Sequence, residues 1–252
     1  SNKASIVKGD KYRFTILTDR LIRMEYSSNG VFEDRSTQLV TFRNFTPINF
    51  SVSETETLLE IKTNYYTLTY VKNKPFIGNK ILIGNTLKVK LNNSDREWFF
   101  NSPEVRNFGS ISYSLDDYNG NLKLDKGLYS VDGFASLDDS NSYVLNKENV
   151  FVKRDNIETD VYLFCYRRDF GLCLKDYYEL TGYPSLIPRY ALGNWWYKND
   201  KYSSDDIYNL INKFNDNQIP VSILVLGDKW HNNVNNYTFD NSLININSVS
   251  NF

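Results

Sequence analysis

The stretch VLGDKWH, residues 225–231, places Asp228, Trp230 and His231 directly after the apolar run at 219–226. A carboxylate can accept two hydroxyl hydrogen bonds, an indole can cover a flat apolar face, and an imidazole can bond a polar group. His231 is the only histidine of the chain. Such a trio at the end of a buried strand predicts the rim of a binding site.

A strand, a helix and a second strand are expected to position this trio. The segment 203–220 predicts an amphipathic helix, and Ser203 with Asp206 matches a capping box at its start. The apolar positions that share one helix face are Ile207, Leu210, Ile211 and Phe214. The next run, VSILVL at 221–226, is apolar at five of six positions, which is typical of a strand covered on both sides. This order predicts a right-handed βαβ unit with parallel strands.

Trp195 and Trp196 belong to the strand expected before this helix, in YALGNWW at 190–196. Ligands of α/β barrels bind at the carboxyl ends of the strands, so we expect this pair and 227–231 to face one site. Adjacent residues of a strand point to opposite faces. At most one of the two indoles therefore lines the site, and the other packs on a helix.

The upstream part of the chain reads as many short strands. KYRFTILT (11–18) and NYYTLTYV (64–71) are rich in β-branched and aromatic residues and are separated by turn sequences. In the second run, one face is expected to hold Tyr66, Leu68 and Tyr70. This pattern predicts an antiparallel β-sandwich. A short helix within 172–184 then leads to a boundary, which gives domains 1–187 and 188–252.

Composition excludes several classes of partner. The chain has 29 basic and 30 acidic residues, a net charge of -1, so we expect no nucleic-acid partner and no membrane partner.

Cys165 and Cys173 are expected to be buried thiols, and no metal site or cofactor is indicated. No secretion signal is visible, and Ser1-Asn2 resembles the remnant of an expression tag. The expected location is the cytoplasm.

Several long segments resemble glycoside hydrolase family 31, the α-glucosidase and α-xylosidase family. They are RFTILTDRLIRMEYS (13–27), GVFEDRSTQ (30–38), GLYSVDGFASLDDS (127–140), LTGYPSLIPRYALGNWW (180–196), VLGDKWH (225–231) and NYTFD (236–240). The resemblance implies a mainly β chain: a galactose-mutarotase-like antiparallel β-sandwich, then the first two βα units of a truncated (β/α)₈ barrel. A complete barrel needs about 250 residues, and residues 188–252 leave room for two units.

The activity that the resemblance implies is hydrolysis of terminal α-linked sugars with retention of configuration. One carboxylate attacks and a second acts as acid and base, about 5–5.5 Å apart. In the family both lie on later barrel strands, so we expect no catalytic residue within this chain and no activity from it alone. The expected partners are an α-linked oligosaccharide and the remainder of the barrel or another copy of the chain.

The resemblance also implies sugar-binding residues. The family commonly carries an aspartate at the end of the second strand, and Asp228 is the candidate, although counting from Ile219 places the usual aspartate on Gly227. Trp230 and His231 match an aromatic-histidine pair of some members. From the sandwich, Asp132 is the candidate for an acidic loop residue that reaches the site.

Other acidic residues of the sandwich have simpler interpretations. Asp138 and Asp139 are expected to hold a turn, and Glu33, Asp34 and Arg35 are expected to form a solvated or self-paired polar turn.

Two other functions stay open beside the enzyme. The sandwich is a carbohydrate-binding module in one of them and only a brace for the barrel in the other. In all three, two barrel strands alone leave a free edge and an uncovered apolar face, so we expect 188–252 to be poorly protected, self-associated or completed by another polypeptide.

Overall fold

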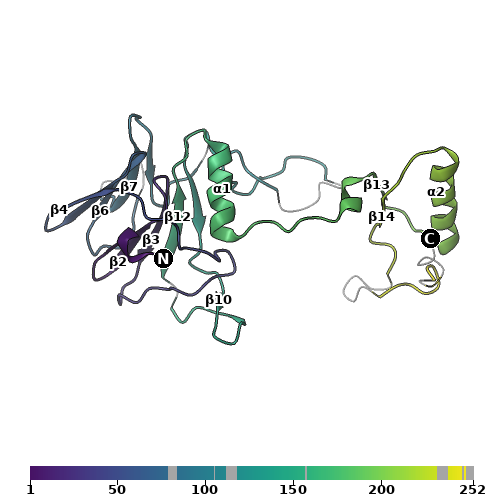
Figure 1. The fold of residues 1–252 in the computed structure, drawn as a ribbon, viewed down its shortest axis with the longest axis horizontal. Helices are drawn as coiled ribbons and strands as arrows, with labels where there is room; N and C mark the ends of the chain where they lie inside the picture. The colour runs from purple at the N-terminus through teal and green to yellow at the C-terminus, as the bar shows by residue number, and fades with distance from the viewer. Residues whose placement is uncertain are drawn as a thin grey trace. The chain divides into compact units, whose positions relative to one another are not determined.

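The computed structural model describes residues 1–78, 84–104, 106–111, 118–156, 158–231, 238–245 and 247 (Figure 1). The chain divides into two compact units, Ser1–Pro184 and Ser185–Phe252.

The first unit is built on two antiparallel five-stranded sheets. The inner sheet has the spatial order β1 (Ile6–Lys8), β2 (Tyr12–Ile16), β3 (Leu21–Tyr26), β12 (Thr159–Phe164), β9 (Ala135–Asp138). The outer sheet has the order β4 (Ser51–Glu54), β5 (Leu58–Lys62), β6 (Tyr66–Val71), β7 (Leu87–Leu91), β8 (Glu97–Phe99). A short 3-10 helix, η1 (Lys3–Ser5), precedes β1, and β10 (Val144–Leu145) pairs with β11 (Phe151–Val152). The predicted mainly β chain is confirmed.

The outer sheet shows the alternation that the sequence predicted. Tyr66, Leu68 and Tyr70 are fully buried, whereas Thr67 and Thr69 between them are only half-buried. A strand with one face on a core and the other toward water has this pattern. The core between the two sheets contains Phe14, Ile16, Ile22, Met24, Leu59, Ile61, Val89, Trp98, Val161 and Leu163 beside the residues of β6.

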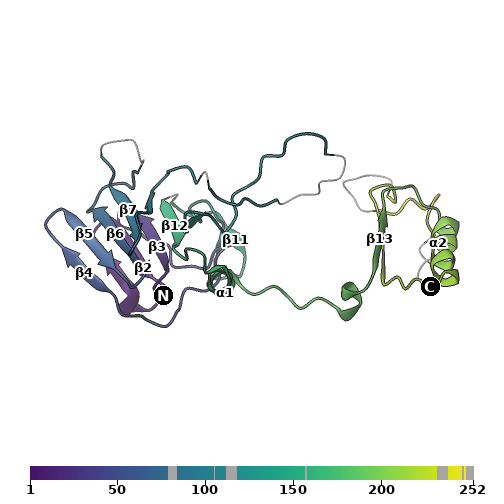
Figure 2. The same ribbon diagram turned by 90° about the horizontal axis from the view of Figure 1, so that it is seen from above.

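The inner sheet is covered on both faces. Every residue of β2 is buried, and a second apolar cluster lies on the side away from the outer sheet. That cluster joins Tyr162 and Phe164 of β12 to Cys173 and Leu180 of helix α1 (Phe170–Thr181). Both views place α1 beside β12, on the far side from β4–β7 (Figures 1 and 2). Helix α1 therefore forms a third layer beside the two sheets.

Helix α1 ends at Thr181, within the segment 172–184 in which a helix was predicted. Gly182 is its C-cap with φ of 103°, and its N–H donates to the carbonyl oxygen of Tyr178 over 2.8 Å. A side chain is strained at such a φ, so glycine suits this stop. At the other end, the Asp169 side chain accepts from the N–H of Leu172. Cys165 and Cys173 are both free and buried, as expected.

The second unit is a strand, a helix and a strand. The 3-10 helix η2 (Arg189–Leu192) leads to β13 (Trp195–Lys198), then α2 (Ser204–Asp216) and β14 (Ile223–Leu226). The two strands pair in parallel, with Trp195 opposite Ile223 and Lys198 opposite Leu226. The predicted parallel pair around a helix is confirmed.

Helix α2 begins with the predicted capping box. The Asp206 N–H donates to Ser203 Oγ over 3.1 Å, and the Ser203 N–H donates to Asp206 Oδ2 over 2.9 Å. The bond with Ser203 also lowers the pKa of the Asp206 carboxyl. Within the described parts of the chain, no helix is both long and apolar enough to cross a membrane.

Candidate functional site

The carboxyl ends of β13 and β14 lie at one edge, because Lys198 pairs with Leu226 in a parallel register. Asn199 and Asp200 follow the first strand, and Gly227 and Asp228 follow the second. Ligands of parallel α/β sheets bind outside this end of the strands. We therefore treat this edge as the candidate site.

The carboxylates at this edge differ in how they are engaged. Asp200 forms an ion pair with Lys198 at 2.7 Å, and this hydrogen bond lowers the pKa of the Asp200 carboxyl. Asp228 is exposed and makes no hydrogen bond or ion pair with the described residues. Its carboxylate is thus available to accept hydrogen bonds from a ligand.

A side chain at Gly227, where the resemblance places the usual aspartate, would meet the side chain of Asn199. A Cβ built on Gly227 would lie 2.5 Å from Asn199 Oδ1 and 3.2 Å from Asn199 Cγ. The Asn199 side chain therefore lies over the backbone of Gly227. Asn199 was not among the predicted site residues, although it is the first residue after β13 and begins a polar run.

Trp230 and His231 form an aromatic cluster with the segment that follows them. The ring centroids of Trp230 and His231 lie 4.7 Å apart, and those of Trp230 and Phe239 are also 4.7 Å apart. His231 and Phe239 pair through an isolated antiparallel bridge, and the Asp240 N–H donates to the Trp230 carbonyl oxygen over 3.0 Å. The indole of Trp230, two residues after Asp228 in the sequence, is therefore held against Phe239. Of the segment NYTFD, residues 236 and 237 lie outside the described residues.

The two neighbouring tryptophans face opposite sides of β13, as their adjacency predicted. Trp196 packs on Phe214 of α2, with ring centroids 5.2 Å apart. Trp195 lies on the other face, 54% exposed, and its Nε1 donates to the Ala191 carbonyl oxygen over 2.9 Å. Trp195 is thus the member of the pair that does not pack on the helix.

The prediction that Trp195 and Trp196 lie at the carboxyl end of their strand is wrong. β13 begins at Trp195, so the pair starts the strand rather than ending it. At about 3.3 Å of rise per residue, Trp195 is roughly 10 Å from the edge that carries Asp228. The apolar run extends to Tyr197, and the pattern alone did not show where pairing begins.

Asp132 lies in the first unit, just before β9. Its carboxylate pairs with Arg96 and with Arg106, the latter at 3.1 Å. A cleft of about 380 Å³ beside it is also lined by Arg167 and Arg168. Two guanidinium groups bind the Asp132 carboxylate. These contacts hold its loop to Arg96, directly before β8, and to Arg106, which follows β8.

The acidic residues that were expected to be structural make contacts within the protein. The Asp138 side chain accepts from the Ser140 N–H over 3.0 Å, which is a turn contact. Glu33 accepts from Arg35 Nη2 over 2.8 Å, the predicted self-pairing. Asp34 instead pairs with Arg13 at 2.7 Å.

A buried ion network crosses the inner sheet beneath this turn. Arg23 donates to both carboxylate oxygens of Asp160, at 2.8 and 2.7 Å, and its Nη2 lies 3.1 Å from Glu25. Arg154 pairs with Asp160 at 3.0 Å. Burial alone would raise the pKa of Asp160, but the charges of Arg23 and Arg154 outweigh it and the pKa is lowered.

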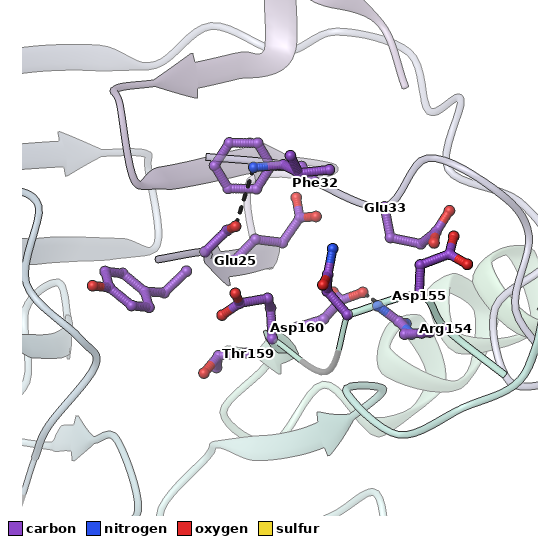
Figure 3. Close-up of a pocket in the computed structure, with 12 residues that line it drawn as sticks. Glu25, Phe32, Glu33, Arg154, Asp155, Thr159 and Asp160 are labelled. Atoms are coloured by element: carbon purple, nitrogen blue, oxygen red, sulfur yellow. Dashed lines mark hydrogen bonds and ion pairs between the residues drawn. The ribbon is translucent and has the colours of Figure 1, made fainter. Parts of the chain in front are cut away.

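A small pocket opens on this network. Figure 3 shows the side chains of Glu25, Glu33, Arg154, Asp155 and Asp160 gathered around it. Its volume of about 60 Å³ holds a few water molecules, each of which needs about 10–15 Å³ of such volume. The charged side chains that line the pocket bind one another. No group of His, Cys, Asp and Glu side chains that could hold a metal ion occurs among the residues described.

The fold of the chain is similar to that of several solved enzyme structures. A dextranase of glycoside hydrolase family 31 from Flavobacterium johnsoniae, complexed with isomaltotriose, matches with a TM-score of 0.58 over 96% of this chain at 15% identity. A family 31 α-xylosidase from Xanthomonas citri matches with a TM-score of 0.57 over 96% of this chain at 12% identity. A cycloalternan-forming enzyme from Listeria monocytogenes, in complex with a pentasaccharide substrate, matches with a TM-score of 0.54 over 96% of this chain at 14% identity.

These matches cover only part of each relative. The chain spans 35% of the dextranase, 47% of the α-xylosidase and 27% of the cycloalternan-forming enzyme. By sequence, an isomaltosyltransferase from Sporosarcina globispora is 30% identical over 81 residues, which are 32% of this chain and 7% of that protein. No family model matches the sequence. The chain therefore has a fold found in family 31 enzymes, over about a third of their length.

Proposed function

We propose, from the fold that the chain shares with glycoside hydrolase family 31 enzymes, that it is the N-terminal portion of a retaining α-glycosidase. In this proposal, Ser1–Pro184 is the sandwich and β13–α2–β14 is the start of the catalytic barrel. The observation that carries the proposal is that the similarity spans 96% of the chain and both units, in one order.

Asp228 is the proposed sugar ligand at the carboxyl edge of the strands. Its exposed carboxylate makes no hydrogen bond with the described residues, so it can accept two hydroxyl hydrogen bonds. Trp230 offers a flat indole for a sugar face, and His231 beside it offers an imidazole. These groups bind and orient a sugar but do not break a bond.

The bond-breaking carboxylates are proposed to come from outside these two strands. Retention needs a nucleophile and an acid/base about 5–5.5 Å apart. At this edge Asp200 is tied to Lys198, which leaves Asp228 without a free carboxylate partner among the described residues of the edge. The chain alone is therefore expected to bind weakly and to cleave nothing.

The proposed substrate is an α-linked glucose oligosaccharide. The dextranase was complexed with isomaltotriose, and the sequence relative is an isomaltosyltransferase. Isomaltose units are therefore the first oligosaccharides to test, beside p-nitrophenyl α-glucoside and α-xyloside.

The test compares this chain with the full-length gene product. The longer product should cleave at least one α-glycoside with retention, and the 252-residue chain should cleave none. In the longer product, Asp228→Asn keeps the size of the side chain and removes its charge, and it should raise KM about ten- to hundredfold. A full-length product that cleaves no α-glycoside would refute the proposal.

A non-catalytic sugar-binding module is the second candidate. The chain spans only 35% of the dextranase, and the polar groups at its strand edge suit binding rather than bond cleavage. Titration of this chain with maltose and isomaltose by NMR separates the two. Millimolar or tighter binding without any activity of the full-length product would favour the module.

A further inference from the structure

Asn199 and Gly227 are fitted to one another at the carboxyl edge of the parallel strands. Lys198 and Leu226 form the last pair of β13 and β14, so Asn199 and Gly227 are the next residues on each strand. The space above Gly227 contains Asn199 Oδ1, 2.5 Å from where a Cβ would be. Any larger residue at 227 would displace the carboxamide.

The carboxamide of Asn199 is exposed and makes no hydrogen bond within the described residues. Two other polar groups of β13 are engaged: Lys198 with Asp200 at 2.7 Å, and Trp195 Nε1 with the Ala191 carbonyl oxygen at 2.9 Å. Lys229 Nζ contacts only the backbone oxygen of Asn199, at 3.5 Å. Asn199 thus keeps one acceptor and two donors available at the place where ligands of such strands bind.

We propose that Asn199 is a sugar-binding residue that determines specificity at this edge, and that its carboxamide occupies a space which the lack of a side chain at Gly227 leaves open. This inference rests on the proposed function. A carboxamide can donate to one hydroxyl and accept from its neighbour, whereas the Asp228 carboxylate can only accept. Together they require a sugar with hydroxyls at defined positions, because a site group left without its hydroxyl costs binding energy.

The experiment uses the full-length gene product and a series of monodeoxy p-nitrophenyl α-glucosides beside the parent glucoside. Asn199→Ala should raise KM for the parent glucoside about tenfold with little change in kcat, the effect of losing one hydrogen bond to a bound hydroxyl. For one deoxy substrate, the unmodified enzyme should have a lower kcat/KM than for the parent glucoside. Asn199→Ala should have similar kcat/KM values for that deoxy substrate and the parent, which identifies the hydroxyl that Asn199 binds. Gly227→Ala should raise KM in the same direction.

Asn217→Ala is the matched control. Asn217 caps α2, and its side chain donates only to the Lys213 carbonyl oxygen of its own helix, over 2.8 Å. It should leave KM unchanged. Far-UV circular dichroism should show all variants folded, since Asn199 makes no hydrogen bond within the described residues.

The outcomes separate the two proposals. If the unmodified full-length product neither cleaves nor binds α-glucosides, the proposed function fails and the role of Asn199 fails with it. If the unmodified product is active and Asp228→Asn is impaired while Asn199→Ala and Gly227→Ala are not, only the role of Asn199 is overturned. Raised KM in both Asn199→Ala and Gly227→Ala, with loss of discrimination against one deoxy substrate, supports it.

Discussion

The inner sheet of the sandwich is covered on both faces, whereas among the described residues helix α2 covers one face of the parallel strands in the βαβ unit. All five residues of β2 are buried, while all four residues of β14 are only half-buried. In the second unit α2 covers Trp196, but Trp195 and Tyr197 on the opposite face are 54% and 46% exposed. The inner sheet therefore lies between two apolar clusters of its own unit, whereas β13 keeps two exposed aromatic side chains beside a polar strand edge.

Hydrogen exchange should show the largest difference between the two units. Amides of β12, between β3 and β9, should exchange only on global unfolding of the sandwich. Amides of β14, which pairs only with β13 in the described part of the chain, should exchange about a thousandfold faster. Mass spectrometry of peptides from both strands in a dilute monomer makes the measurement. Equal protection of the two strands would mean that the βαβ unit is stable as it stands.

Breaking the buried ion network should affect the sandwich strongly. Arg23→Met removes both bonds to Asp160 and leaves that carboxylate short of partners in a buried place. The expected loss is about 3–5 kcal/mol of the free energy of unfolding. Urea titration of the 252-residue chain, followed by far-UV circular dichroism, measures it.

Lys72→Met is the control for that experiment. Lys72 pairs with the exposed Glu54 at 3.1 Å, and such a pair contributes about 0–1 kcal/mol. Similar losses for the Arg23 and Lys72 variants would show that the network contributes no more than a surface pair.

The network illustrates what local patterns can predict. Tyr12, Phe14 and Ile16 alternate with Arg13 and Thr15, a pattern typical of a strand with one apolar face. The same pattern suggests that the other face meets water, yet Arg13 is buried there. Its coverage comes from the distant turn that contains Glu33 and Asp34. Such contacts depend on tertiary structure and have no signal in the strand itself.

The candidate site shows the same limit. The capping box and the parallel order of the second unit followed from short spacings, and both are confirmed. The predicted position of Trp195 and Trp196 in β13 was wrong, because the strand begins at Trp195 and continues to Lys198 and the sequence pattern does not mark where pairing begins. Asn199 was missed because only the pairing of β13 with β14 brings it over Gly227.

The free energy of unfolding of the sandwich should be highest in mildly acidic solution. Burial raises the pKa of Asp139 and Glu25, so the stability that they contribute is lost as pH rises through those values. The pKa values of Asp160 and Glu33 are lowered, since arginine charges and hydrogen bonds outweigh burial. Their contribution is present above about pH 4 and is lost as pH falls below it.

Urea midpoints between pH 8 and pH 2 measure this profile. Asp160→Asn should remove much of the loss of stability on the acid side, because an asparagine at this position takes up no proton on unfolding. A midpoint that stays constant down to pH 2 in the unmodified chain would contradict the assignment of these carboxyls.

The smallest effect is expected in the second unit, from Ser203→Ala. This change removes the acceptor for the Asp206 N–H at the start of α2, and loss of an N-cap costs about 1 kcal/mol. Asn209→Ala, at an exposed position within the same helix, keeps the cap and should not destabilise it. Because the βαβ unit is held by few contacts, amides of α2 should exchange faster in Ser203→Ala while those of β12 stay unchanged. If both sets of amides change together, the two units unfold as one, and the contrast between a self-contained sandwich and an independent βαβ unit does not hold.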